Sequence, residues 1–202
     1  MSLNLNDIIT HIRDRGYMTG VQRTHARVKS TGEVFTPTEL VREMLDQIPI
    51  EKFEDPAKTF LDPSCGDGQF LGEVLIRKLE YLKDENNNIT DEQFKSVLES
   101  IYGIDLMTDN VKETHKRLLC NSKKKQFKQI VTRNIICRSG LDYDYSFNGT
   151  PYTNKELEEQ QQVLLGIVPE KAPSKIKKTK KTTSANSNFN TIFSPAPNKL
   201  FG

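Results

Sequence analysis

The amino-acid sequence predicts an α/β domain with a parallel sheet, and two patterns carry this prediction. Three short apolar strand candidates alternate with amphipathic helices in the order β-α-β-α-β, which favours a parallel sheet joined by right-handed crossovers. The first strand runs into the glycine-rich junction Asp62-Pro63-Ser64-Cys65-Gly66-Asp67-Gly68, and the next strand ends in Asp105. Both features are typical of a ligand site at the carboxyl edge of such a sheet.

Two helices are predicted before the first strand of the sheet. Residues 3–14 place apolar side chains at helical spacing, with Asn6 as the N-cap. The second helix begins near Pro37 with Thr36 as its cap, and Pro49 ends it. Its predicted apolar stripe consists of Leu40, Val41, Met44, Leu45 and Ile48.

The remaining elements follow from apolar runs and from helical periodicity. Strands are expected at residues 59–61, 100–105 and 134–137, and helices at residues 69–83, 91–99 and 108–119. The stretch DENNNITDE, residues 84–92, overlaps the start of the second of these helices and is otherwise expected to be a surface loop.

Composition predicts one folded domain and an appendage. The chain has 202 residues, of which 35% are hydrophobic and 28% charged, so part of its length is expected to stay unpacked. Residues 170–188 are rich in Lys, Ser, Thr and Asn and are predicted to be a disordered linker. We therefore expect a folded domain over residues 1–165 and a linker with a tail motif over residues 166–202.

The cysteines indicate the cellular compartment and whether a metal site is expected. Cys65, Cys120 and Cys137 form no CxxC pair, so neither a disulfide framework nor a zinc site is expected, and a reducing cytosol fits best. The N-terminal residues lack the apolar region of a signal peptide, and no run of 18 apolar residues occurs. The expectation is a cytoplasmic protein without a metal or a membrane span.

Taken alone, the glycine-rich junction and Asp105 each allow two interpretations. The glycines let a ligand approach the backbone at a helix start, yet a purely structural tight turn is the alternative. A dinucleotide fingerprint would need a glycine where Leu71 stands, and the GK[ST] of a phosphate loop is absent. Asp105 could accept the hydroxyls of a ribose or serve as the N-cap of the helix that follows it.

Three motifs occur together in the order GEVFTP, FLDPSCGDGQFL and IYGIDLMTDNV. They resemble the S-adenosylmethionine-dependent, adenine-specific (N6) DNA methyltransferases of restriction–modification systems and phages, over about residues 28–145. The resemblance implies a Rossmann-like methyltransferase fold with flanking helices, shortened here at its C-terminal side. It also implies S-adenosylmethionine as the cofactor, DNA as the partner, and the cytoplasm of a bacterial or phage-infected cell.

The same resemblance assigns roles to residues. The FTP motif and the glycine-rich turn would line the methionine end of the cofactor, Asp105 would hold the ribose, and Leu106 would cover the adenine ring. Ser139 stands where the family has an Asp that contacts the adenine amino group, so a weaker contact is expected there. The implied cofactor-binding residues are Phe35, Thr36, Pro37, Asp62, Pro63, Ser64, Cys65, Gly66, Gly68, Asp105, Leu106 and Ser139.

The chain departs from the family in the catalytic motif, which is NPPY or DPPY. Its nearest counterpart is the segment NGTPY, where Gly149 holds the place of the catalytic Asn. Asn148, one residue out of place, and Tyr152 are the local candidates for positioning a flipped adenine. A full fold has seven strands and only three are predicted here, so a cofactor-binding portion is better supported than a complete enzyme.

Basic and C-terminal segments indicate an alternative function. Arg23, Arg27 and Lys29, together with the lysines at residues 123–125 and 128, would bind a DNA backbone in a salt-sensitive way or form an ordinary solvated surface. Residues 189–202 end in NKLFG and loosely resemble peptides that dock on sliding clamps. The alternative is a catalytically inactive methyltransferase-fold protein that acts as a DNA- or partner-binding accessory factor.

Overall fold

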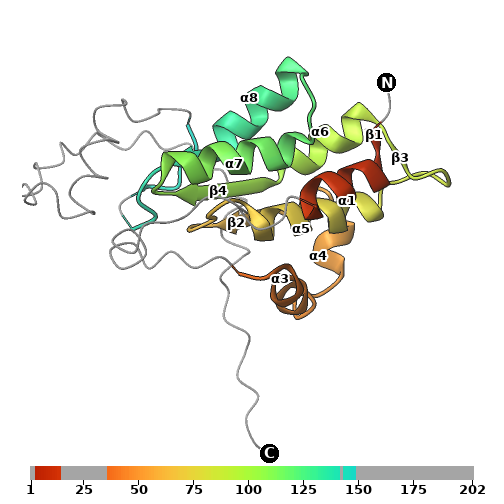
Figure 1. Ribbon diagram of the computed structural model, residues 1–202, viewed down its shortest axis with the longest axis horizontal. Coiled ribbons are helices and arrows are strands. Elements are labelled where there is room, and N and C mark those ends of the chain that lie inside the picture. The colour runs from red at the N-terminus through yellow and green to blue at the C-terminus, as the bar shows by residue number, and fades with distance from the viewer. Residues whose placement is uncertain (1–2, 15–35, 142, 149–202) are drawn as a thin grey trace, which may run out of the picture. The chain divides into compact units, whose positions relative to one another are not determined.

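A computed structural model describes residues 3–14, 36–141 and 143–148 of the chain (Figure 1). Its main sheet has three parallel strands in the order β2 (Phe60–Asp62), β4 (Ile101–Asp105) and β5 (Ile135–Cys137). Leu61 pairs with Tyr102, and Ile104 pairs with Ile136. The predicted parallel sheet is confirmed over these strands, with β4 in the centre.

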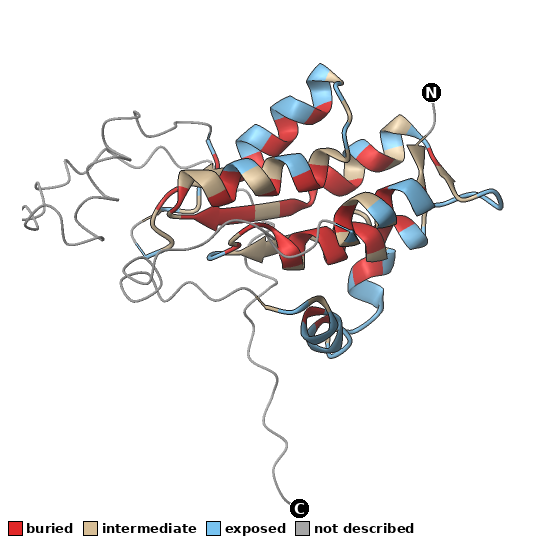
Figure 2. Ribbon diagram, in the orientation of Figure 1, coloured by how far each residue is buried: buried red, intermediate tan, exposed pale blue. Residues whose placement is uncertain are grey.

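The helices between the strands form one connected layer. They are α5 (Gln69–Glu80), α6 (Asp91–Glu99), α7 (Thr108–Leu119) and α8 (Lys125–Asn134). All four contact β4, and α5 with α7, α7 with α8, and α6 with α8 contact each other. Their inward sides are buried, as Figure 2 shows, and supply core residues that include Leu71, Leu75, Leu79, Phe94, Val97, Leu118 and Phe127. The spans predicted for α6 and α7 are correct.

A short aromatic segment covers part of the other face of the sheet. A side chain on Gly103 would meet Leu71 of α5, so its neighbour Tyr102 points to the opposite face. The ring of Phe147 packs on Tyr102 with centroids 4.8 Å apart, and the ring of Tyr143 lies 5.4 Å from Phe147. Residues 143–148 therefore pack on the face that the layer of helices leaves open.

Two N-terminal helices also contact α5. They are α1 (Leu5–Arg13) and α3 (Thr38–Leu45), and the short helix α4 (Glu51–Glu54) follows α3. Ahead of α1, strand β1 (Leu3–Asn4) pairs antiparallel with β3 (Asn88–Ile89), with Leu3 opposite Ile89. The expectation of a plain surface loop at residues 84–92 is wrong, because Ile89 is fully buried in this pair.

The structure corrects both predicted helix caps. Helix α1 begins at Leu5, because the side chain of Asn4, not Asn6, is its cap and accepts the Asn6 N–H at 3.0 Å. Helix α3 begins at Thr38 with Pro37 in the N-cap position and no side-chain cap bond, so Thr36 does not cap it.

The predicted apolar stripe of α3 is only partly buried. Val41 and Leu45 are buried, whereas Leu40 and Met44 are 45% and 50% exposed. Helix α3 also ends at Leu45, before the predicted Ile48, which packs against the core from the following turn.

Helix α8 was not predicted, and smaller boundary errors surround it. Three buried apolar side chains, Phe127, Ile130 and Val131, hold α8 against the core, and lysines and glutamines separate them in the sequence. Asn134 ends this helix instead of starting β5, and its side chain donates to the Leu98 carbonyl at 3.1 Å. Helix α5 ends at Glu80, not at residue 83, and β2 lies one residue later than predicted.

Several predictions lie outside the described residues. They concern the basic side chains of residues 16–34, the domain boundary at residue 165, the linker and the tail. None of the helices in the described ranges combines the length and the apolar character of a membrane span.

A buried lysine closes the amino end of the sheet. Lys78 of α5 has no exposed surface, and its Nζ donates to the Pro56 carbonyl at 3.0 Å and to the Ser100 hydroxyl at 2.8 Å. Burial lowers the pKa of Lys78 to about 8, and the nearby carboxylate of Asp55 opposes this shift. The charged form of Lys78 is thus less favourable in the folded chain than in water.

This shift predicts a pH dependence of stability. Between the folded pKa of about 8 and the ordinary value of 10.5, the unfolded chain binds more protons at Lys78 than the folded chain does. The free energy of unfolding should therefore rise with pH across this window through Lys78. Burial raises the pKa values of Cys65 and Cys137, and these thiols act in the opposite direction.

Comparison of the native chain with Lys78→Met separates the contribution of the lysine to the pH dependence of stability from that of the thiols. Urea unfolding at about pH 7 and about pH 10 should show a larger gain with pH for the native chain than for the variant. An equal pH response of both proteins would contradict the assignment.

Candidate cofactor-binding site at the carboxyl edge of the sheet

The glycine-rich motif forms the turn between β2 and α5. Gly66 and Gly68 have φ values of 53° and 83°, in the left-handed region that favours glycine. Gly68 is the N-cap of α5, and its N–H donates to the Cys65 carbonyl at 2.8 Å. A Cβ on Gly68 would lie 2.7 Å from Cγ2 of the fully buried Thr114, so the turn closes against α7 without room for a side chain.

Asp105, at the carboxyl end of β4, is bonded to this turn. Its Oδ2 accepts the Gly66 N–H at 2.9 Å, while its Oδ1 accepts the Met107 N–H at 2.8 Å and Nδ2 of Asn110 at 3.1 Å. The side chain is buried, with 8% of the residue exposed. These three bonds fix the carboxylate between the glycine turn and the start of α7.

The alternative role of Asp105 as a helix cap is not what the structure shows. The N-cap residue of α7 is Met107, which makes no side-chain cap bond. Asp105 instead accepts the N–H of that N-cap residue, from two positions earlier in the chain.

Arg117 of α7 holds the turn through a buried ion pair. Its guanidinium donates to Oδ2 of Asp67 at 2.7 Å and to the Asp67 carbonyl at 3.0 Å. A third bond, 3.0 Å long, reaches the Ile12 carbonyl of α1. The side chains of Arg117 and Asp67 are only 4% and 5% exposed, so one arginine joins α7, α1 and the glycine turn.

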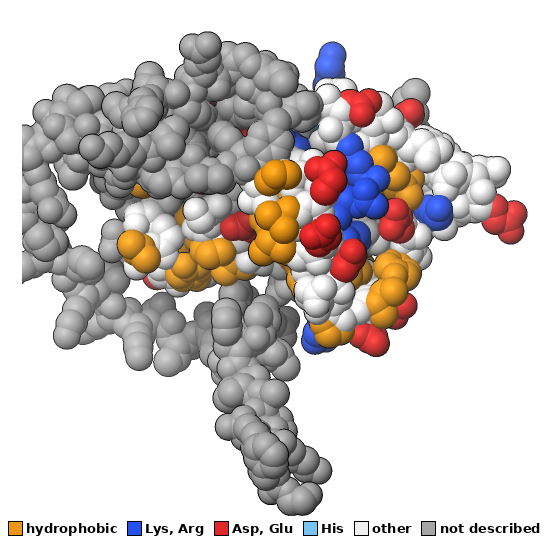
Figure 3. All heavy atoms as spheres, turned by 60° about the horizontal axis from the view of Figure 1, so that its bottom comes forward, with side chains coloured by type: hydrophobic (Ala, Val, Ile, Leu, Met, Phe, Trp, Pro, Cys, Tyr) orange, Lys and Arg blue, Asp and Glu red, His pale blue; other side chains and the backbone are white. Residues whose placement is uncertain are grey.

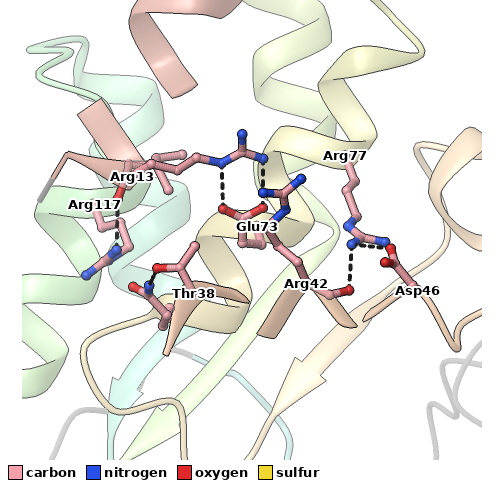
Figure 4. Close-up of polar contacts among 9 residues, drawn as sticks. Arg13, Thr38, Arg42, Asp46, Glu73, Arg77 and Arg117 are labelled. Atoms are coloured by element: carbon pink, nitrogen blue, oxygen red, sulfur yellow. Dashed lines mark hydrogen bonds and ion pairs between the residues drawn. The ribbon is translucent and has the colours of Figure 1, made fainter. Parts of the chain in front are cut away.

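Polar contacts also bring the start of α3 to the start of α5 (Figure 4). Nε2 of Gln69, the first residue of α5, donates to the hydroxyl of Thr38. Further along α5, Glu73 pairs with Arg13 of α1 at 2.9 Å, and Arg77 pairs with Asp46 after α3 at 2.6 Å. Because Thr38 directly follows Thr36 and Pro37, these two predicted residues lie close to the glycine turn.

The segment after β5 closes the same edge. The Arg138 N–H donates to the Asp105 carbonyl at 3.0 Å. A Cβ on Gly140 would lie 2.5 Å from the Pro63 carbonyl oxygen, so this segment passes directly against the turn. Ser139 lies between these two contacts, and its hydroxyl accepts the Leu141 N–H at 3.3 Å.

The edge of the sheet is acidic. Oδ1 of Asp62 accepts the Ser64 N–H at 3.0 Å, and burial raises the pKa of Asp62 against the effect of that bond, with Asp105 raising it further. Burial also raises the pKa of the Cys65 thiol well above its ordinary value, and the carboxylates of Asp105 and Asp62 add to the shift. Such an edge suits a ligand that offers hydroxyl or cationic groups.

Most of the predicted cofactor residues are thus brought together. The turn from Asp62 to Gly68 lies beside Asp105, Leu106 follows Asp105 directly, and Ser139 closes the edge. Phe35 and Tyr152 lie outside the described residues.

The candidate catalytic residue Asn148 lies beside the aromatic segment. It is exposed, and it directly follows Phe147, whose ring packs on Tyr102 of β4.

Three residues that support the site were not predicted. Asn110, Thr114 and Arg117 are buried polar residues of α7, and each one bonds to Asp105 or to the glycine turn; Thr114, for example, donates to the Gly66 carbonyl at 3.0 Å. Their spacing of four and three residues places them on one face of the helix beside Val111 and Leu118. Polar residues within the apolar face of a helix were the available signal.

Two cavities lie elsewhere in the described part of the chain. One, of about 630 Å³, is lined by β1, α1 and the loop between α7 and α8. The other, of about 330 Å³, lies among α3, α4 and α5, on a face where acidic, basic and hydrophobic side chains are intermixed (Figure 3). Neither cavity is lined by the glycine turn. The described residues contain no group of three or more His, Cys, Asp or Glu side chains suited to a metal ion.

The parallel sheet, the glycine turn and the acidic strand end define a small α/β unit compatible with a methyltransferase fold. The family model described as N-6 DNA Methylase matches residues 20–163, and the chain belongs to this family, as its motifs predicted. Neither the curated proteins nor the solved structures include a match. Membership supports a function related to DNA methylation, in a family that is generally dependent on S-adenosylmethionine.

Proposed function

We propose that this chain binds S-adenosylmethionine at the carboxyl edge of its sheet, in a Rossmann-like arrangement, and serves as the cofactor-binding portion of an adenine-specific DNA methyltransferase. The observation that carries the proposal is the bond between the Gly66 N–H and Asp105. It joins the glycine turn to an acidic strand end at the place where α/β sheets bind nucleotide-like ligands.

The residues of this edge fit the chemistry of that cofactor. Asp105 would accept the ribose hydroxyls, since a carboxylate offers about four acceptor positions. The turn around Gly66 and Gly68 would give the methionine end close access to the backbone, with Phe35, Thr36 and Pro37 beside it. Leu106 and Ser139 would face the adenine ring and its amino group. When bound, the cofactor supplies a methyl group on a cationic sulfur.

The catalytic part of the proposal rests on the resemblance. Asn148 and Tyr152 would accept the hydrogens of the target amino group and stack on the base, respectively. Gly149 and Thr150 stand where the family has its Asn and its first Pro. This departure favours a second function, an inactive methyltransferase fold that binds DNA or, through residues 189–202, a partner protein.

A pair of measurements separates the two functions. Calorimetry with S-adenosylmethionine tests the cofactor site, and transfer of a radiolabelled methyl group to unmodified DNA tests catalysis. Cofactor binding together with transfer supports the enzyme, whereas cofactor binding without transfer on any DNA supports the accessory factor.

Replacing the acid at the strand end should weaken cofactor binding. Asp105→Ala is expected to reduce the affinity for S-adenosylmethionine by about 1.5–3 kcal/mol, the scale of hydrogen bonds to a charged group. Calorimetry below the melting temperature of the variant measures the effect. Glu92→Ala, which removes an exposed carboxylate from α6, is the control and should bind as the native chain does. Equal affinity of Asp105→Ala and the native chain would refute the role of Asp105, and no heat from the native chain at about millimolar cofactor would refute the site.

A further inference from the structure

Positive charge is concentrated in one stretch of the chain. From Thr114 to Leu141 the sequence contains Lys, Arg and His but no Asp or Glu, although the whole chain carries a net charge of only +2. The unpredicted helix α8 lies in the middle of this stretch.

Helix α8 displays these charges on one side. Phe127, Ile130 and Val131 are buried against the core, so the opposite side faces solvent. The exposed residues of that side are Lys125, Gln126, Lys128, Gln129, Thr132 and Arg133. Lys125 and Arg133 are eight residues apart, which corresponds to about 12 Å along the helix.

Three acids on the neighbouring helices α6 and α7 are paired with other cations. Asp91 of α6 pairs with Lys124, and Glu99 pairs with Lys95. On α7, Glu113 pairs with Lys116. Glu92 of α6 is exposed, and no ion pair to it occurs within the described ranges. Within the described ranges, Lys125, Lys128 and Arg133 have no carboxylate within ion-pair distance.

The opposite side of this unit has a different electrostatic character. Around α3 and α5, the side chains of Arg13 and Arg77 are paired with Glu73 and Asp46, and both signs of charge are intermixed (Figure 3). In Figure 1, α8 lies above the sheet and α4 lies below it. The stretch around α8, which contains no Asp or Glu, therefore differs from the α3 and α5 side, where acidic side chains accompany the basic ones.

We propose that the exposed side of α8 binds the phosphate backbone of duplex DNA. Lys, Arg, Gln and Thr side chains are the groups that contact phosphate oxygens, and they carry no base specificity when they do so. One strand presents a phosphate about every 3.4 Å along the duplex axis, so a row of about 12 Å can follow three or four of them. The proposal rests on the proposed function insofar as DNA is the substrate, and it adds an anchoring surface separate from the glycine turn.

Salt-dependent binding by the full-length chain tests the proposal. Fluorescence anisotropy with a labelled duplex of about 20 base pairs gives the slope of log K against log salt concentration, to which each phosphate contact contributes about 0.9. The triple variant Lys125→Gln, Lys128→Gln and Arg133→Gln should reduce the magnitude of this slope by about 3. Its affinity at about 0.1 M salt should fall by about 100-fold or more, equally for unrelated sequences.

A matched control variant removes the same number of positive charges from the side of α3 and α4. Arg42→Gln, Lys52→Gln and Lys58→Gln replace one arginine and two lysines, all exposed, on α3, on α4 and just after α4. This control should bind DNA with the slope and affinity of the native chain. Equal losses in both triple variants would overturn the proposal, because only the net charge would then matter.

Further measurements test the α8 surface independently of the cofactor site. Calorimetry with S-adenosylmethionine should give the same affinity for the α8 triple variant and the native chain. Failure of the native chain to bind duplex DNA, or a native slope in the α8 variant, would overturn the α8 surface whatever the cofactor does. Competition by polyglutamate as effective as that by DNA would also overturn it, since an acidic protein would then be the better partner.

Discussion

Arg117→Ala is expected to destabilise the folded chain by about 3–5 kcal/mol, the range for breaking a buried ion pair from one side. The substitution leaves the Asp67 carboxylate, which is 5% exposed on its side chain, without its guanidinium. It also removes the donors to the carbonyls of Asp67 and Ile12. Urea unfolding at neutral pH measures the loss, which should appear as a lower midpoint.

Matched variants separate the buried pair from charge in general. Lys116→Ala, one residue earlier on α7, removes an exposed cation that pairs with Glu113 and should cost less than about 1 kcal/mol. Adding Asp67→Asn to Arg117→Ala should recover part of the loss, because the buried side chain that lost its guanidinium is then neutral. A loss below about 1 kcal/mol for Arg117→Ala would show that the pair does not hold the turn.

Helix α7 shows which structural features the sequence predicts and which it does not. Its bounds were predicted correctly, because Val111, Leu118 and their neighbours follow helical spacing. The roles of Asn110, Thr114 and Arg117 were not predicted, since each one depends on a partner 5 to 105 residues away in the chain, such as Gly66 or Ile12. Periodicity identifies the inward face of a helix, but it does not tell which loop that face meets.

The missed elements have a different cause. In α8 only Phe127, Ile130 and Val131 supply the apolar face, and the surrounding lysines and glutamines conceal its periodicity. Strands β1 and β3 each have two residues, so an alternating pattern cannot develop within them, and they form only because distant segments pair. The stripe predicted for α3 failed at Leu40 and Met44, which are exposed although their spacing is helical.

The sequence predicted which residues lie together at the candidate site, but it did not predict the hydrogen bonds that they make. The glycine turn follows one strand and Asp105 ends the next, and the sequence locates both strands. Their meeting at one edge therefore follows from a parallel sheet. The bonds that occupy Asp105 depend on the path of the backbone after β4, where the Met107 N–H turns back toward the carboxylate. A ligand that binds to Asp105 must therefore use the acceptor positions left on a carboxylate that already accepts three hydrogen bonds.

Gly68→Ala should destabilise the chain by about 2–5 kcal/mol, the second largest effect expected. A φ of 83° costs about 1–2 kcal/mol for a residue with a Cβ, and overpacking adds about 1–3 kcal/mol. The steric part arises because the new Cβ would lie 2.7 Å from Cγ2 and 2.9 Å from Oγ1 of Thr114, which is fully buried and cannot swing away.

A double-mutant cycle with Thr114→Ala separates the two costs. Thr114→Ala alone loses the bond to the Gly66 carbonyl, about 1 kcal/mol. It also removes the two nearest atoms that the new Cβ would meet, Cγ2 and Oγ1, and leaves Cβ of residue 114 at 3.1 Å. The double variant should thus be more stable than the sum of the single effects by about 1–3 kcal/mol, while the backbone strain at position 68 remains. Strict additivity in urea unfolding would mean that the turn does not close on Thr114, and the packing of the glycine turn against α7 would then be wrong.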